Sequence, residues 1–240
     1  MIISGLQKTT LLDYPGHVAA TVFLGGCNFR CLFCHNMNIV TDPEYMITKE
    51  EVLSFLIKRV NVLDGVCITG GEPTINSDLI DFIRSIKDIK NKNGCPLLVK
   101  LDTNGTNPKM LNSLIEDKLV DYIAMDIKTS IDEYSKVCNI EKDQEKSRYI
   151  KDVCESIKII MQSMVEYEFR TTIIKQYHDE NTIRKIGETI KGAKAYYLQS
   201  FIDSEYVLDH SLCEREKKEL LDYCNILKEY NISAYIRGVD

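Results

Sequence analysis

Three cysteines lie close together in the chain, at Cys27, Cys31 and Cys34, with the spacing C-x3-C-x2-C. They follow directly on the apolar run Val18–Leu24 and its closing Gly25-Gly26. Three thiolates this close on one loop can hold three corners of one soft-metal centre. A [4Fe–4S] cluster with three protein thiolates leaves one iron open to another ligand, by the same logic as the open position of a catalytic zinc. The spacing therefore favours an iron–sulfur cluster with one accessible iron.

Two other interpretations of these cysteines stay open. In one, His35 is the fourth ligand of a zinc site, and in the other the cysteines are unrelated buried thiols. The zinc site is less favoured because His35 is adjacent to Cys34, and neighbouring residues rarely reach one tetrahedral metal together. The remaining cysteines form no second C-x2-C run, so we expect a single cluster and ordinary thiols at Cys67, Cys95, Cys138, Cys154, Cys213 and Cys224.

Polar groups also follow, or lie beside, four later strand-like runs. They are Gly70-Gly71-Glu72-Pro73, Asp102-Thr103-Asn104-Gly105, Asp126 with Lys128, and Arg170. Taken singly, each has an ordinary explanation as a glycine turn, an Asn-Gly turn, a helix cap or an edge charge. Their shared position argues otherwise, because the carboxyl ends of parallel strands meet at one edge of a sheet or barrel. We therefore expect one pocket to collect them.

The double glycine suggests what that pocket binds. Two glycines allow the backbone to approach a ligand closely, and Glu72 would place a carboxylate beside it. A carboxylate there suits an ammonium group.

The elements that must position these groups alternate between short apolar runs and longer amphipathic ones. We expect strands at 18–24, 65–69, 97–101, 122–125, 169–174, 195–199 and 232–236, and helices at 48–59, 77–90, 109–117, 131–137, 144–164, 181–191 and 212–230. This order predicts an α/β fold with parallel strands joined by crossover helices. About six units fit, fewer than the eight of a closed barrel, which predicts a partial, open parallel β/α barrel. A flat doubly wound sheet is the alternative, because periodicity does not separate the two.

Length and composition limit the class of protein. The chain has 240 residues, 44% apolar and 28% charged, which excludes overall disorder and fibrous repeats. We expect one domain over residues 1–240, with a core at about 17–202 and a C-terminal helix and strand at about 211–237. No apolar run approaches the roughly 18 residues of a membrane helix. The net charge of −6 argues against nucleic-acid binding. Nine cysteines without a visible signal peptide indicate reduced thiols or metal ligands, not a disulfide framework, and a cytoplasmic location.

The cysteine triplet followed by Gly70-Gly71-Glu72-Pro73 resembles the radical S-adenosylmethionine (SAM) superfamily, and that likeness implies the partial barrel. Within it, Cys34-His35-Asn36, Asp102–Gly105 and Asp126-x-Lys128 are similar to the activating enzymes of glycyl-radical enzymes. The opening segment Leu11–Ala20 resembles the activating proteins of anaerobic ribonucleoside-triphosphate reductases. The likeness is strong from Leu11 to Glu72, fair to about Arg170 and weak beyond.

The resemblance implies roles for these residues. The cysteines would hold a [4Fe–4S] cluster whose fourth iron takes the amino and carboxylate groups of SAM. The SAM-binding residues it implies are Gly70, Gly71 and Glu72 at the methionine amino group, Phe33 at the adenine, Lys128 at the carboxylate, Arg170 at the ribose or carboxylate, and Asn104 in the Asp102–Gly105 motif. Asp102 and Asp126 match two acids that help to bind a monovalent cation in the pyruvate formate-lyase activating enzyme.

Two departures from the family limit this transfer. Pyruvate formate-lyase activators carry Asp-Gly-Pro-Gly with a following Arg, where this chain has Asp13-Tyr14-Pro15-Gly16-His17. They also place a His after the sixth strand, where this chain has Leu198-Gln199-Ser200-Phe201. Gln199 is the candidate to contribute in its place.

The resemblance implies a one-electron reaction on a partner protein. A flavodoxin or ferredoxin would reduce the cluster, SAM would be cleaved, and the resulting radical would take a hydrogen atom from a glycine of a glycyl-radical enzyme. We expect that partner to be an anaerobic ribonucleotide reductase, with the turn in Leu11–His17 at the barrel rim beside the incoming loop. The alternatives are activation of pyruvate formate-lyase or another glycyl-radical enzyme, a radical SAM reaction on a small molecule, and a non-catalytic metal or electron-transfer module.

Overall fold

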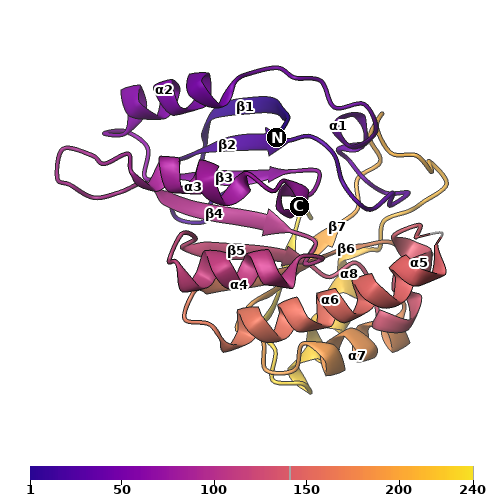
Figure 1. Ribbon diagram of the computed structural model, residues 1–240. Coiled ribbons are helices and arrows are strands. Elements are labelled where there is room, and N and C mark those ends of the chain that lie inside the picture. Colours follow the sequence, from indigo (N-terminus) through magenta and orange to yellow (C-terminus); the bar gives the residue numbers. More distant parts are fainter. Residues whose placement is uncertain (141, 240) are drawn as a thin grey trace.

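A computed structural model describes residues 1–140 and 142–239; Glu141 and Asp240, which belong to the expected domain, lie outside the described residues (Figure 1). Within those ranges, eight strands form one sheet in the order of the sequence. The strands are β1 (Ile3–Thr10), β2 (Ala19–Leu24), β3 (Gly65–Gly70), β4 (Leu98–Thr103), β5 (Tyr122–Asp126), β6 (Glu166–Ile173), β7 (Tyr196–Ser200) and β8 (Ala234–Arg237). β1 is antiparallel to β2, and all later neighbours are parallel.

The helices follow the strands. They are α1 (Met37–Thr41), α2 (Lys49–Arg59), α3 (Leu79–Lys87), α4 (Pro108–Glu116), α5 (Tyr134–Val137), α6 (Asp143–Gln162), α7 (Glu180–Thr189) and α8 (Lys217–Lys228). The capping box expected at the start of α2 is present: the Thr48 hydroxyl accepts a hydrogen bond from the Glu51 N–H at 3.0 Å, and the Glu51 carboxylate accepts one from the Thr48 N–H at 2.8 Å. These two bonds fix where α2 begins.

The partial barrel is confirmed. A doubly wound sheet reverses its strand order at a switch point, whereas these strands follow one another without reversal, so the flat alternative is wrong. Six parallel strands, β2 to β7, are each followed by a helical segment, in agreement with the expected number of units. The sheet does not close, because β1 and β8 are its two edges.

The two faces of the sheet differ in polarity because side chains alternate along each strand. The outward-facing residues, such as Val66, Ile68 and Leu101, are fully buried in the hydrophobic core together with residues of the helices. Between them on the strands lie polar inward-facing residues, such as Lys100 and Glu168. The hydrophobic core therefore lies between sheet and helices, and the inner face is free to carry charged groups.

The sequence analysis did not predict strand β1. Its middle, Leu6–Thr9, is half-buried or exposed, and its pairing with β2 has register shifts between Ile3 and Gly5 and between Gln7 and Thr10. An irregular edge strand with one wet face gives little hydrophobic periodicity to read. β1 lies N-terminal to the expected core at about 17–202.

The segment Leu11–His17 connects β1 to the start of β2, at the amino ends of the parallel strands. Tyr14 is buried there, with its ring 5.9 Å from the ring of Tyr122 at the start of β5. The loop that carries Cys27, Cys31 and Cys34, called the cysteine loop below, follows the carboxyl end of β2. The expectation that this turn stands beside an incoming partner loop is therefore wrong, because it lies at the opposite end of the barrel.

Within the described residues, no helix combines the length and the apolar composition that crossing a membrane requires.

An ion pair between a buried acid and a half-buried arginine ties the last strand to the inner face. Glu168 on β6 is fully buried, and its two carboxylate oxygens accept hydrogen bonds from the guanidinium of Arg237 on β8 at 2.7 and 2.8 Å. The Tyr122 hydroxyl donates a third bond to Glu168 at 2.9 Å. The guanidinium also lies 3.5 Å from the ring centre of Tyr197. Arg237 therefore adds a side-chain link from β8 to β6 to the backbone pairing of β8 with β7.

We predict that Arg237→Met lowers the free energy of unfolding by about 3 kcal/mol, because it leaves the Glu168 carboxylate buried without its cation. Adding Glu168→Gln should recover about 1 kcal/mol or more, since the uncompensated charge is then gone. Urea unfolding of the two variants measures both effects. A single variant as stable as the wild type would contradict this role for the pair.

Candidate metal and cofactor site

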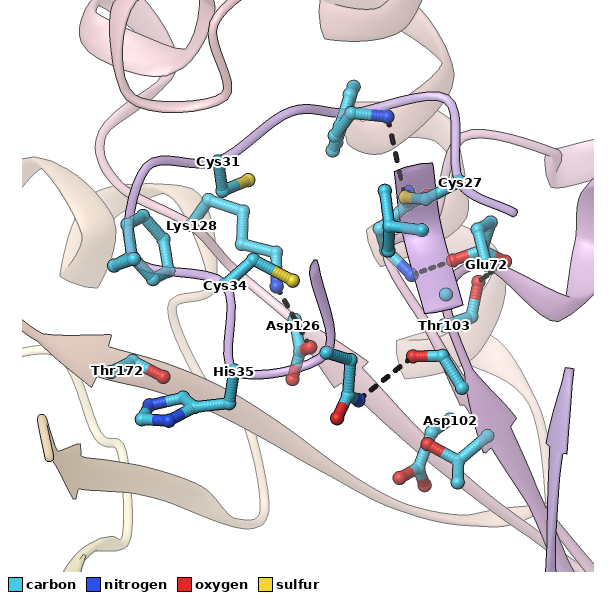
Figure 2. Close-up of a pocket in the computed structure, with 18 of the residues that line it drawn as sticks. Cys27, Cys31, Cys34, His35, Glu72, Asp102, Thr103, Asp126, Lys128 and Thr172 are labelled. Carbon is cyan, nitrogen blue, oxygen red and sulfur yellow. Dashed lines mark hydrogen bonds and ion pairs between the residues drawn. The ribbon is translucent and has the colours of Figure 1, made fainter. Parts of the chain in front are cut away.

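The cysteine loop is held against the turn that follows β3. The N–H of Gly71 donates to the carbonyl of Leu24 at 2.8 Å, and the N–H of Glu72 donates to the carbonyl of Gly26 at 2.9 Å. Within the loop, the Cys34 N–H donates to the Cys31 carbonyl at 3.1 Å. Figure 2 shows the three cysteine sulfur atoms around one space beside Lys128. The loop thus presents its thiols together at the carboxyl end of β2.

The three thiols differ in the direction of their pKa shifts. Burial raises the pKa of Cys27 to about 12 and also raises the pKa of Cys34. The pKa of Cys31 is lowered instead, chiefly by a hydrogen bond from the thiol of Cys138. Metal ligation requires thiolates, so binding at this loop must release protons from Cys27 and Cys34.

The geometry argues against the zinc interpretation. The Nδ1 atom of His35 lies 3.4 Å from the hydroxyl of Ser204, and its ring is 5.8 Å from that of Phe201. Figure 2 shows the His35 ring turned away from the cysteine sulfurs. Among residues 1–140 and 142–239, no three His, Cys, Asp or Glu side chains converge as one ion requires. In a [4Fe–4S] cluster each thiolate binds a different iron, so the thiols need not meet at a point.

All residues singled out as ligands line one cavity of about 250 Å³. They are Cys27, Cys31, Cys34, Phe33, Gly70, Gly71, Glu72, Asp102, Asn104, Asp126, Lys128, Arg170 and Gln199. Six strands, from β2 to β7, contribute to this lining through their carboxyl ends or the turns and loops that follow. The expected single pocket is therefore present.

Glu72 has a different task from the one expected. Its carboxylate is fully buried and accepts hydrogen bonds from the Thr74 N–H at 3.0 Å, the Thr74 hydroxyl at 2.6 Å and the Thr103 hydroxyl at 2.8 Å. Its second oxygen accepts from the Asn104 N–H at 2.6 Å. Burial raises the pKa of this carboxyl group. Because these contacts occupy both oxygens, Glu72 joins the turns after β3 and β4 and does not offer a free carboxylate to an ammonium group.

Asn104 carries this connection on to the cysteine loop. Its side-chain amide donates to the Oδ1 atom of Asn28 at 2.9 Å and lies 3.9 Å from the sulfur of Cys27. Asn28 in turn donates to the hydroxyl of Thr106 at 2.8 Å. The Asp102–Gly105 motif therefore fixes the position of the loop that holds the cysteines.

The two glycines are required by contacts within the chain. A Cβ atom on Gly71 would lie 1.9 Å from the carbonyl oxygen of Gly26, and Gly70 has φ +124 with Leu24 backbone atoms in the same place. The expectation that these glycines make room for a ligand is thus incomplete. They first make room for the cysteine loop itself.

A charged network crosses the floor of the cavity. Arg170 donates from Nε to Asp126 at 2.8 Å and from NH1 to Asp102 at 3.2 Å. Lys128 donates to the other oxygen of Asp126 at 2.9 Å, as Figure 2 shows. Although burial alone would raise it, these cations bring the pKa of Asp126 to about 2. Arg170 is therefore an inner-face bridge between two acids and not an edge charge.

Lys100 is the charged residue that the sequence analysis missed. It lies on β4 with 1% of its surface exposed, and its ammonium group contacts Asp102 and lies 3.7 Å from the sulfur of Cys67. A signal was available. Lys100 interrupts an apolar run two residues before Asp102, so both side chains must face the same side of the strand.

Two buried side chains hold the backbone at Lys128. The ring of His178 accepts the Ile174 N–H through Nδ1 at 2.9 Å, so its Nε2–H donates to the Lys128 carbonyl at 2.9 Å. The Tyr134 hydroxyl accepts the Lys128 N–H at 3.2 Å. Burial lowers the pKa of His178 to about 4. A neutral imidazole in one tautomer is thus built into this part of the site.

Comparison with known proteins gives a consistent result. The profile of the radical SAM superfamily matches residues 21–186. A Methanocaldococcus jannaschii protein named "Putative glycyl-radical enzyme activating enzyme" is 32% identical, over 100% of this chain and 97% of its own length.

Two solved structures share the fold. A radical SAM methyltransferase from Sphaerobacter thermophilus superposes with a TM-score of 0.71 at 15% identity, covering 93% of this chain and 67% of its own. A domain of a pyruvate-formate lyase-activating enzyme from Bacteroides vulgatus superposes with a TM-score of 0.55 at 17% identity, covering 72% of this chain and 99% of its own.

We predict that Gly71→Ala disrupts the cysteine loop, because the added Cβ atom collides with the backbone of Gly26. The variant should lose about 2 kcal/mol of stability. It should also retain less than about half of the iron that the wild type binds after anaerobic reconstitution. Gly5→Ala is the matched control, because a Cβ atom there meets only side-chain atoms of Phe23 at ordinary distances. Full iron content in Gly71→Ala would refute this reading of the turn.

We predict that His178 makes stability depend on pH. Its pKa is lower in the folded protein than in the unfolded chain, so its stabilising effect is complete above about pH 6.5 and is lost as the pH falls toward 4. Between pH 7 and pH 5 this loss amounts to about 2 kcal/mol.

Urea unfolding at several pH values in this range measures how the free energy of unfolding changes with pH. This change should be smaller in His178→Gln than in the wild type. The charged groups near the ring, Arg215 and Asp179, are unchanged in that variant. An equal change in the wild type and His178→Gln would contradict the prediction.

Proposed function

The chain belongs to the radical SAM superfamily of enzymes, and from this premise we propose that it installs a glycyl radical on a partner protein. The observation that carries the proposal is the M. jannaschii relative, which is similar along the whole chain and is named for this activity. A sheet with two unpaired edges supports it, because an open barrel leaves room for an extended loop.

The chemistry of the donor set fits the cofactors of the family. Three thiols on one loop line the same cavity as a charged network, so a cluster and SAM would be neighbours. When bound, the [4Fe–4S] cluster supplies the electron that cleaves SAM to methionine and a 5′-deoxyadenosyl radical, which then takes a hydrogen atom. Cys27, Cys31 and Cys34 would hold the cluster.

The other lining residues would bind and orient SAM. Lys128 and Arg170 are cationic and suit the methionine carboxylate. The backbone of the Gly70–Glu72 turn suits the amino group, since the Glu72 carboxylate is occupied by Thr74, Thr103 and Asn104.

Three further residues complete the proposed SAM site. Phe33 would contact the adenine, and Gln199 would reach the ligand from β7. Asn104 would act through the position of the cysteine loop.

We further propose an anaerobic ribonucleotide reductase as the partner and a flavodoxin or ferredoxin as the electron donor. The support for this partner is the resemblance of Leu11–Ala20 to the activating proteins of such reductases. Its support does not come from a docking role of that segment, which lies at the far end of the barrel. All nine cysteines are free, which suits the reducing cytoplasm as the place of reaction.

We predict that the reduced protein, mixed with SAM and an anaerobic ribonucleotide reductase without oxygen, produces a doublet glycyl-radical signal in electron paramagnetic resonance. The reaction should fail with Cys31→Ala, which lacks one cluster ligand, and with a reductase whose radical glycine is changed to alanine. A radical on pyruvate formate-lyase but not on the reductase would refute the partner. Turnover of a small molecule without any protein radical would refute the activase proposal and leave the SAM chemistry standing.

A further inference from the structure

Lys100 is a buried cation directly beneath the proposed SAM site. It lies on β4, two residues before Asp102 and on the same face of the strand. Its ammonium group contacts one oxygen of Asp102, and its other polar neighbour is the sulfur of Cys67 at 3.7 Å. A lysine with 1% of its surface exposed requires a charged partner, because burying an unpaired charge is costly. Asp102 is that partner.

The two acids of the network have no oxygen left over. One oxygen of Asp102 pairs with the ammonium group of Lys100, and the other pairs with the guanidinium of Arg170 at 3.2 Å. One oxygen of Asp126 pairs with Arg170 at 2.8 Å, and the other pairs with Lys128 at 2.9 Å. Three cations therefore face two carboxylates, which leaves one positive charge in surplus. That surplus suits the carboxylate of an incoming ligand.

These residues do not fit a monovalent metal ion, which the family resemblance implies at Asp102 and Asp126. A hard cation needs several oxygen ligands to replace its water shell. Here each carboxylate oxygen already accepts from a cationic N–H group, and an added ion would lie among three like charges. The acids also stay ionised at neutral pH. Burial alone would raise the pKa values of Asp102 and Asp126, but Arg170 and the neighbouring lysines hold these pKa values below the usual range.

We propose that the ammonium group of Lys100 is the resident cation of this site, so that SAM binds without an alkali-metal ion. The inference rests on the proposed function, because it concerns the SAM site. It gives Lys100 a positioning role: by pairing with one oxygen of Asp102 it leaves the other directed at Arg170, and Arg170 is thereby held at the ligand.

The test measures SAM affinity of the cluster-loaded protein by anaerobic calorimetry. The buffers have equal ionic strength, and their only cation is tetramethylammonium, sodium or potassium. The wild type should bind SAM equally in all three, within about two-fold. Lys100→Met removes the charge at similar length. Its affinity should fall at least about ten-fold in tetramethylammonium and recover in potassium or sodium, because a small ion can then enter beside Asp102.

Lys87→Met is the matched control. Lys87 is also largely buried and pairs with Asp121, 2.5 Å away, but it lies outside the cavity. This variant should bind SAM with wild-type affinity in every buffer. Iron content and thermal unfolding of each variant establish that it is folded and loaded.

Two results would overturn the proposal: a wild-type affinity that rises more than about five-fold on adding sodium or potassium, or Lys100→Met binding as tightly as the wild type in tetramethylammonium. If Lys100→Met does not load iron, the wild-type comparison decides. A wild type that binds no SAM in any buffer would instead count against the proposed function.

Discussion

The buried carboxylate of Glu72 is the interaction on which the site depends. It accepts hydrogen bonds from Thr74 after β3, from Thr103 at the end of β4 and from Asn104 just after it. Asn104 continues the chain of contacts to Asn28 in the cysteine loop. One buried acid thus fixes three loops relative to one another. A buried carboxylate is tolerated only when its oxygens are satisfied, so the loops cannot separate without exposing or orphaning it. The arrangement of the thiols follows from this constraint.

The charged inner face completes the arrangement. The hydrophobic core lies between sheet and helices, so the inner face can be polar without loss of the apolar burial that stabilises the barrel. Its charges are paired in two sets, Glu168 with Arg237 near the last strand, and Asp102 and Asp126 with their three cations under the cavity. The first set fixes an edge of the sheet. The second leaves one positive charge for a ligand.

The sequence predicted the strand ends well and the reasons for individual residues less well. The hydrophobic pattern and the turn residues that end each apolar run located β2 to β8. Runs closed by Gly-Gly or Asp-Thr-Asn-Gly are strong signals. β1 was not predicted, because an edge strand with a solvent-exposed face shows no clear hydrophobic periodicity. Gly71 and Glu72 were assigned to a ligand, although their contacts are with Gly26 and Asn104, because contacts between distant loops leave no local pattern. The same holds for Leu11–His17, whose end of the barrel is set by the unpredicted β1.

The roles proposed for the site residues all require that the protein cleaves SAM reductively. The product of this cleavage can be measured without a partner protein. The reconstituted chain, reduced with dithionite in the absence of oxygen and given SAM, should release 5′-deoxyadenosine, detected by liquid chromatography and mass spectrometry. Cys31→Ala should release none, while Cys95→Ala, which changes an exposed cysteine outside the cavity, should match the wild type. A fully iron-loaded wild type that binds SAM and yields no 5′-deoxyadenosine, or a Cys31→Ala variant that yields as much as the wild type, would contradict the assignment.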